Sequence, residues 1–239
     1  MLNPTVAVIT FRATLGRRRA LLFAIPPVIL IGLTVILRAT NPPNHGWPYT
    51  ILGDFGFSVL LPLTALIIGT SVLGAEIDDG SIVHLLATPV SRASVILTKF
   101  TVASLLTMVF AAIPELIAGL IAPSGHKLAI ALLVGAVVGS VIYSAIFVML
   151  STLTTRAVAV GLLYVLIWEG LLGNLIGGVR ILSAGHYALG VANSIAPNTN
   201  LNASLSLDTS LVMGIIVTVG ALVLATRRLA AFGISGEAA

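Results

Sequence analysis

The chain has 239 residues, of which 58% are hydrophobic and only 8% are charged, with a net charge of +4 and no cysteine. Because an average soluble domain carries about 25% charged residues, this composition excludes a soluble enzyme, a disordered chain and a disulfide-stabilised scaffold. What remains is a lipid-embedded protein, with room for about six spans of about 20 residues each and none for a sizeable soluble domain.

Residues 3–19 are predicted to form an amphipathic helix that lies in the membrane interface. Val8, Phe11 and Leu15 recur at helical spacing on one face of this helix, as expected for a side that contacts lipid. A plain basic flank before the first span is the alternative. In either case the segment carries four basic residues that would lie near anionic lipid headgroups: Arg12, Arg17, Arg18 and Arg19.

Six apolar runs predict six transmembrane helices, over residues 20–37, 51–73, 100–122, 128–150, 157–179 and 210–226. An even number of spans puts both termini on one side. Nine of the 12 lysine and arginine residues lie on that side, and such residues are enriched in cytoplasmic loops. We therefore expect a single transmembrane domain over residues 1–239 with both termini in the cytoplasm. This orientation explains the basic charge without a nucleic-acid partner.

The longest loop predicted on the cytoplasmic side, residues 74–92, contains a short helix with an apolar face. Ile82, Leu85 and Leu86 follow the spacing i, i+3, i+4 and share that face. A helix of this kind cannot bury its apolar face alone, so it needs either the rest of the protein or the groove of a partner.

The same loop has a pattern of fixed spacings. Its residues are Glu76, Gly80, Ser81, Ile82, Leu85, Leu86, Thr88, Pro89, Val90, Ser91 and Arg92, with Lys99 seven residues further on. This pattern resembles the cytoplasmic loop of ABC-2-type transporter permeases, E-x3-G-T-x3-L-L-x-x-P-[VI]-S-R followed by a lysine, although Ser81 replaces the commoner threonine. The resemblance implies that residues 81–87 are part of a coupling helix that docks on a nucleotide-binding subunit. The alternative is a turn without a partner.

The resemblance also implies an architecture. It is that of an all-α polytopic membrane protein with an interfacial helix before span one and the coupling helix between spans two and three. Short outer-side helices would lie between spans five and six. In agreement, the segment between Arg180 and Asp208 contains no charged residue, and it is too polar to span a membrane and too apolar for a free loop.

The sequence lacks the motif with which P-loop proteins bind ATP, and this absence bears on where the energy for transport would come from. A P-loop reads G-x4-G-K-[ST], and neither Lys99 nor Lys127, the only lysines, lies in such a pattern. The chain would therefore be no enzyme and bind no cofactor. The resemblance implies that two copies of a separate ABC ATPase bind ATP and Mg, and that a second permease, identical or closely related, completes the complex. The expected function is outward transport of an amphiphilic or hydrophobic substrate across the cell membrane.

Three acidic residues lie within or at the ends of the predicted spans: Asp54, Glu115 and Glu169. Because charges in lipid are costly and face the bundle interior, these residues predict a translocation path that favours cationic amphiphiles. The alternative is a carboxyl that is protonated or hydrogen-bonded within the bundle. An ion-coupled transporter or channel using Glu115 and Glu169 is the second functional hypothesis, and a non-transporting membrane anchor is the third. No acidic or histidine cluster has metal-ligand spacing.

Two Gly-x3-Gly pairs permit close approach of helices. They are Gly135 with Gly139, and Gly173 with Gly177. The pattern alone does not say which helix approaches, and it identifies no dimer interface.

Overall fold

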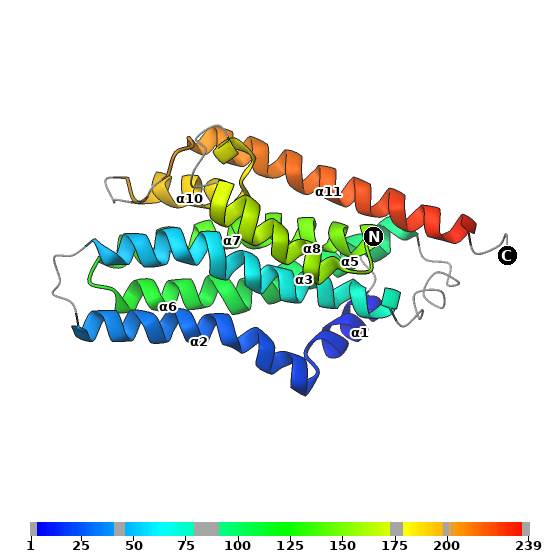
Figure 1. Ribbon diagram of the computed structural model, residues 1–239, viewed down its shortest axis with the longest axis horizontal. Helices are drawn as coiled ribbons and strands as arrows, with labels where there is room; N and C mark the ends of the chain where they lie inside the picture. The colour runs from blue at the N-terminus through cyan, green and yellow to red at the C-terminus, as the bar shows by residue number, and fades with distance from the viewer. Residues whose placement is uncertain are drawn as a thin grey trace.

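The computed structural model describes residues 4–40, 46–78, 91–172, 179–197, 201 and 203–235. Within these residues the chain is helical and contains no strand. The long helices run side by side along the long axis of the molecule (Figure 1). We call the end that contains α1 and the last turns of α11 the terminal end, and the opposite end, which contains α10, the α10 end.

In chain order the structure consists of α-helices, π-helical segments η1 to η3 and the 3-10 turn η4. Their bounds are α1 Pro4–Thr14, α2 Arg17–Thr40, η1 Tyr49–Leu60, α3 Leu61–Asp78, α5 Arg92–Thr107, η2 Met108–Ala112, α6 Ile113–Ile121, α7 His126–Leu153, α8 Ala157–Leu163, η3 Tyr164–Leu172, η4 Val179–Leu182, α10 Ala184–Ile195 and α11 Leu207–Ser235.

In the described part of the chain, five helices are long and apolar enough to cross a bilayer: Leu21–Thr40, Tyr49–Gly74, Arg92–Ile121, His126–Leu153 and Leu207–Ala231. A further apolar helix, Ala157–Leu171, is shorter. It covers the first part of the predicted fifth span, and residues 173–178 of that span lie outside the described residues. The prediction of a polytopic helical membrane protein is therefore confirmed.

The third long helix begins earlier than the sequence predicts, at Arg92 rather than at residue 100. Ser91 is the reason, because its hydroxyl oxygen accepts a hydrogen bond from the backbone N–H of Ser94 at 3.3 Å and so caps the helix. Arg92, which the sequence analysis assigned to the loop, and Lys99, which it placed just before the third span, consequently lie in α5.

α7 is the central helix of the bundle, since it packs against α3, α5, α6, α10 and α11. Figure 1 shows it between α11 and the helices nearer α2. Its buried residues include small polar ones that satisfy themselves within the helix, as apolar surroundings require. The Ser140 and Ser151 hydroxyls, for example, donate to the carbonyl oxygens of Ala136 and Phe147 at 2.6 and 2.9 Å.

The Gly135–Gly139 pair brings α7 against α10. A Cβ added at Gly135 would lie 2.7 Å from the carbonyl oxygen of Ala188, and one added at Gly139 would lie 3.1 Å from the Cβ of Ala188. The pair therefore serves packing within the chain. The second pair, Gly173 with Gly177, lies outside the described residues.

Candidate functional site

The residues predicted to couple the chain to a partner flank a gap in the described structure. Glu76 lies in the last turn of α3, and Arg92 is the first residue of α5. The other six lie outside the described residues: Gly80, Ser81, Ile82, Leu85, Leu86 and Pro89. The structure thus brings the two helices that enter and leave the coupling segment to the terminal end, since α3 and α5 pack against each other.

α1 presents two different faces at the terminal end. Val8 and Phe11 are exposed, as is Arg12, whereas Thr10 and Thr14 are buried against α3 and α5. Val8 and Phe11 are therefore free to contact lipid, and the threonine face contacts the protein. The predicted helix over residues 3–19 is too long, because α1 ends at Thr14, and Leu15 packs against the core instead of facing lipid. Among the other predicted interfacial residues, Arg17, Arg18 and Arg19 form the first turn of α2.

Lys99 is a completely buried cation in α5. Its Nζ donates to the carbonyl oxygen of Val72 in α3 at 2.9 Å and approaches the hydroxyl of Thr10 in α1 at 3.5 Å. Because an ammonium group in an apolar interior must be hydrogen-bonded, Lys99 ties three helices together at the terminal end. Sequence reasoning used Lys99 as an orientation signal and as part of the loop pattern, and it did not predict that the side chain would be buried. The apolar residues one helical turn away on either side, such as Val95 and Ala103, were the signal that it would be buried.

Glu169 is buried in η3 and surrounded by hydrogen-bond donors. Its Oε1 accepts from the Tyr164 hydroxyl at 2.8 Å and from the backbone N–H of Ala184 at 3.0 Å. Its Oε2 accepts from the Ser183 hydroxyl at 2.5 Å and from the backbone N–H of Gly185 at 3.4 Å. The carboxylate therefore caps the N-terminus of α10, where a negative charge is favourable.

Two further contacts fasten the same region. The Trp168 indole N–H donates to the carbonyl oxygen of Leu182 at 3.2 Å, and the Tyr187 hydroxyl donates to that of Ile181 at 2.5 Å. Burial and the nearby charge of Glu169 raise the pKa of Tyr187 to about 12, so the hydroxyl remains a donor at neutral pH. Trp168 thus holds η4 against η3, and Tyr187 holds the start of α10 against η4.

Glu115, in α6, has the opposite environment. It is only 2% exposed, and its Oε2 has no hydrogen-bond partner among the described residues. The carboxyl packs against Gly56 of η1, where an added Cβ would lie 2.2 Å from Oε1. It lines a cavity of about 10 Å³ between α2, η2 and α3.

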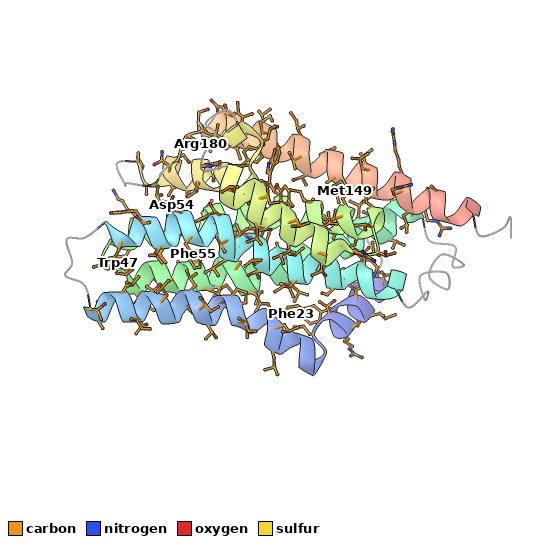
Figure 2. The ribbon with its side chains drawn as sticks, in the orientation of Figure 1. Phe23, Trp47, Asp54, Phe55, Met149 and Arg180 are labelled. Atoms are coloured by element: carbon orange, nitrogen blue, oxygen red, sulfur yellow. The ribbon has the colours of Figure 1, made fainter. Side chains whose placement is uncertain are left out.

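Asp54 occupies a third environment, a polar cavity of about 560 Å³ at the α10 end. Ser58 of η1, Arg180 of η4 and His186 of α10 line the same cavity. Figure 2 shows Asp54 and Arg180 at this end of the bundle. The cavity therefore presents groups of both charges.

One of the three predicted path residues lies in η1 and the other two lie in elements that contact η1, but the three side chains do not come together in one site. η1 contains Asp54, its Gly56 contacts Glu115, and it packs against η3, which carries Glu169. Neither of the two cavities described above is lined by more than one of them. Among the described residues no three acidic or histidine side chains are grouped in a way that could hold a metal ion.

Comparison with known families supplies the remaining finding. The family model described as ABC-2 family transporter protein matches residues 34–233. No curated protein matches the sequence. The matched region contains all the elements from η1 to α10, and with them the coupling segment and the three acidic residues.

Proposed function

The chain belongs to the ABC-2 transporter family, and from that premise we propose that it is the permease subunit of an ABC exporter that moves an amphiphilic or hydrophobic substrate outward. The match over residues 34–233 carries the proposal. Members of this family work with an ABC ATPase subunit, and the five long apolar helices fit the membrane part of such a complex.

ATP hydrolysis would take place on the partner. The chain has two lysines, and neither lies in a P-loop pattern, so ATP and Mg would bind to two copies of a separate subunit. Two permease copies, identical or closely related, would complete the complex. The chain itself would catalyse no reaction.

The terminal end would face the cytoplasm of a cell membrane. The basic residues assigned to it, nine of the 12 in the chain, favour that side. Ala157–Leu171, together with the residues that follow, would complete a sixth span. α10 would then cover the outer mouth, and the polar cavity with Asp54 and Arg180 would open outward.

The coupling segment would transmit the motion of the ATPase into the bundle. α3 and α5 lead directly into it, and Lys99 connects both of these helices to α1. Movement of the segment would therefore shift α1, α3 and α5 together rather than one helix alone.

The association with the ATPase is tested by a charge on the apolar face of the coupling helix. We expect Leu85→Asp to weaken association with a P-loop ATPase subunit from the same source by more than about tenfold, because the interface would have to bury an unpaired carboxylate. His84→Asp is the matched control, since helical spacing puts residue 84 on the opposite face. Co-purification of the tagged permease with the ATPase is the measurement. Equal recovery with Leu85→Asp and with the wild type would contradict the coupling role.

A further inference from the structure

Three irregular helix segments meet at Glu115. α2 contains the consecutive prolines Pro26 and Pro27, η1 is π-helical, and α6 follows the π-helical η2 and contains Pro114. Prolines inside helices remove backbone hydrogen bonds and permit bending, and π-helical turns are frequent at functional sites. The carboxyl group of Glu115 thus lies where three helices are each able to change direction.

Among the described residues, the cavity beside this carboxyl is lined by no charged side chain that would stabilise its negative charge. Thr64 is the one polar side chain besides Glu115 that lines the cavity, and its hydroxyl donates to the carbonyl oxygen of Leu60 at 2.8 Å. The remaining lining is proline and apolar side chains from α2, η1, α3, η2 and α6: Pro26, Pro27, Leu30, Leu60, Leu61, Phe110, Ala111 and Pro114. None is titratable, and α7, which also packs against α6, contributes none to the cavity.

A buried carboxylate without a donor or a cation is much less stable than the neutral acid. Gly56 closes one side of Oε1, because an added Cβ there would lie 2.2 Å from that oxygen. The cavity itself, at about 10 Å³, is at the lower limit for one water molecule. In this packing the cavity leaves room beside the carboxyl for a proton or for at most one water molecule.

We propose that Glu115 is a proton-binding site inside the membrane domain, occupied in the packing described here. Ionisation then requires water, and water reaches the carboxyl when α2 moves away from η1 and α6. α2 is the helix best placed to do so, since much of its surface is exposed to the surroundings and its two prolines weaken it beside the cavity. Transport by an ATP-driven exporter does not require such a site, so the proposal goes beyond the proposed function and does not depend on the ATPase.

Infrared spectroscopy tests the protonation state directly. The difference spectrum between the wild-type chain and Glu115→Gln, both full-length and reconstituted in lipid at neutral pH, should contain the C=O stretch of a protonated carboxyl. Asp208→Asn is the control, because Asp208 is exposed at the start of α11 and its loss should remove carboxylate bands instead. If Glu115→Gln also removed only carboxylate bands, the site would be ionised and the proposal would be overturned.

The pH dependence of thermal unfolding provides a second readout. Unfolding in neutral or alkaline solution would release the proton from Glu115, so the wild type should lose stability relative to Glu115→Gln as the pH rises. The two chains should therefore diverge from mildly acidic to mildly alkaline conditions, with the glutamine variant the more stable at the alkaline end. Unfolding temperatures that follow parallel curves across this range would show that no proton is bound there.

Discussion

Replacing Glu169 with glutamine is expected to lower the free energy of unfolding by about 2–4 kcal/mol, because the amide offers one acceptor oxygen where the carboxylate offers two. Each carboxylate oxygen accepts two hydrogen bonds, from Tyr164, Ser183 and the first backbone N–H groups of α10. Whichever way the amide is turned, its NH2 group faces donors. Thermal unfolding of the purified chain, together with hydrogen exchange of the α10 backbone, measures the effect.

The matched control is the same substitution at Glu115. Both carboxyl groups are 2% exposed, but Glu115→Gln removes no hydrogen bond from Oε2, which has no partner among the described residues. We expect no loss of stability at neutral pH, where release of the Glu115 proton on unfolding makes the wild type the less stable of the two chains, and no change in α10 exchange. Equal losses in the two variants would show that burial rather than capping determines the cost.

The comparison also separates two roles for Glu169. The sequence analysis placed it in a translocation path, and the hydrogen bonds favour an anchor for α10. A path residue would change transport of a cationic substrate in Glu169→Gln without loosening α10. An anchor would loosen α10 first, and any change in transport would follow from that.

The helices could be predicted from the sequence because apolar runs of sufficient length have few alternatives in lipid. The environments of the acidic residues could not be predicted in the same way. Glu169 and Ser183 are separated by 14 positions, so no helical periodicity links them. Glu115 is defined by Gly56 and by prolines of α2, contacts that exist only once the helices pack. Sequence reasoning therefore singled out Glu115 and Glu169, which are buried, and left their two opposite environments open.

The start of α5 and the role of Lys99 illustrate a different limit. A single serine cap at residue 91 starts the helix before the predicted span, so that Lys99, which was expected to precede that span, lies inside the helix and is buried. Such a cap is visible in the sequence, but it is one of several candidates. Only the packed structure shows that the Val72 carbonyl oxygen and the Thr10 hydroxyl accept hydrogen bonds from the Lys99 ammonium group.

The Gly135–Gly139 pair shows how a pattern becomes specific through packing. Small residues at this spacing allow any helix to approach, including that of a second subunit. Here the approaching helix is α10 of the same chain, whose Ala188 lies against both glycines. α10 is therefore fixed from two sides, by α7 through the glycines and by η3 through Glu169.

Gly135→Ala should consequently destabilise the chain by about 1–3 kcal/mol, the range observed for overpacking of interiors. The new Cβ would lie 2.7 Å from the Ala188 carbonyl oxygen, 3.0 Å from the Ala192 Cβ and 3.0 Å from the Phe57 ring, and the backbone carbonyl cannot yield by a side-chain rotation. Gly220→Ala in α11 is the control, because nothing lies within 4 Å of an added Cβ there. Alanine has the higher helix propensity, so the control should be unchanged or slightly more stable in thermal unfolding. A Gly135→Ala chain as stable as the Gly220→Ala chain would mean that α10 does not pack closely on α7.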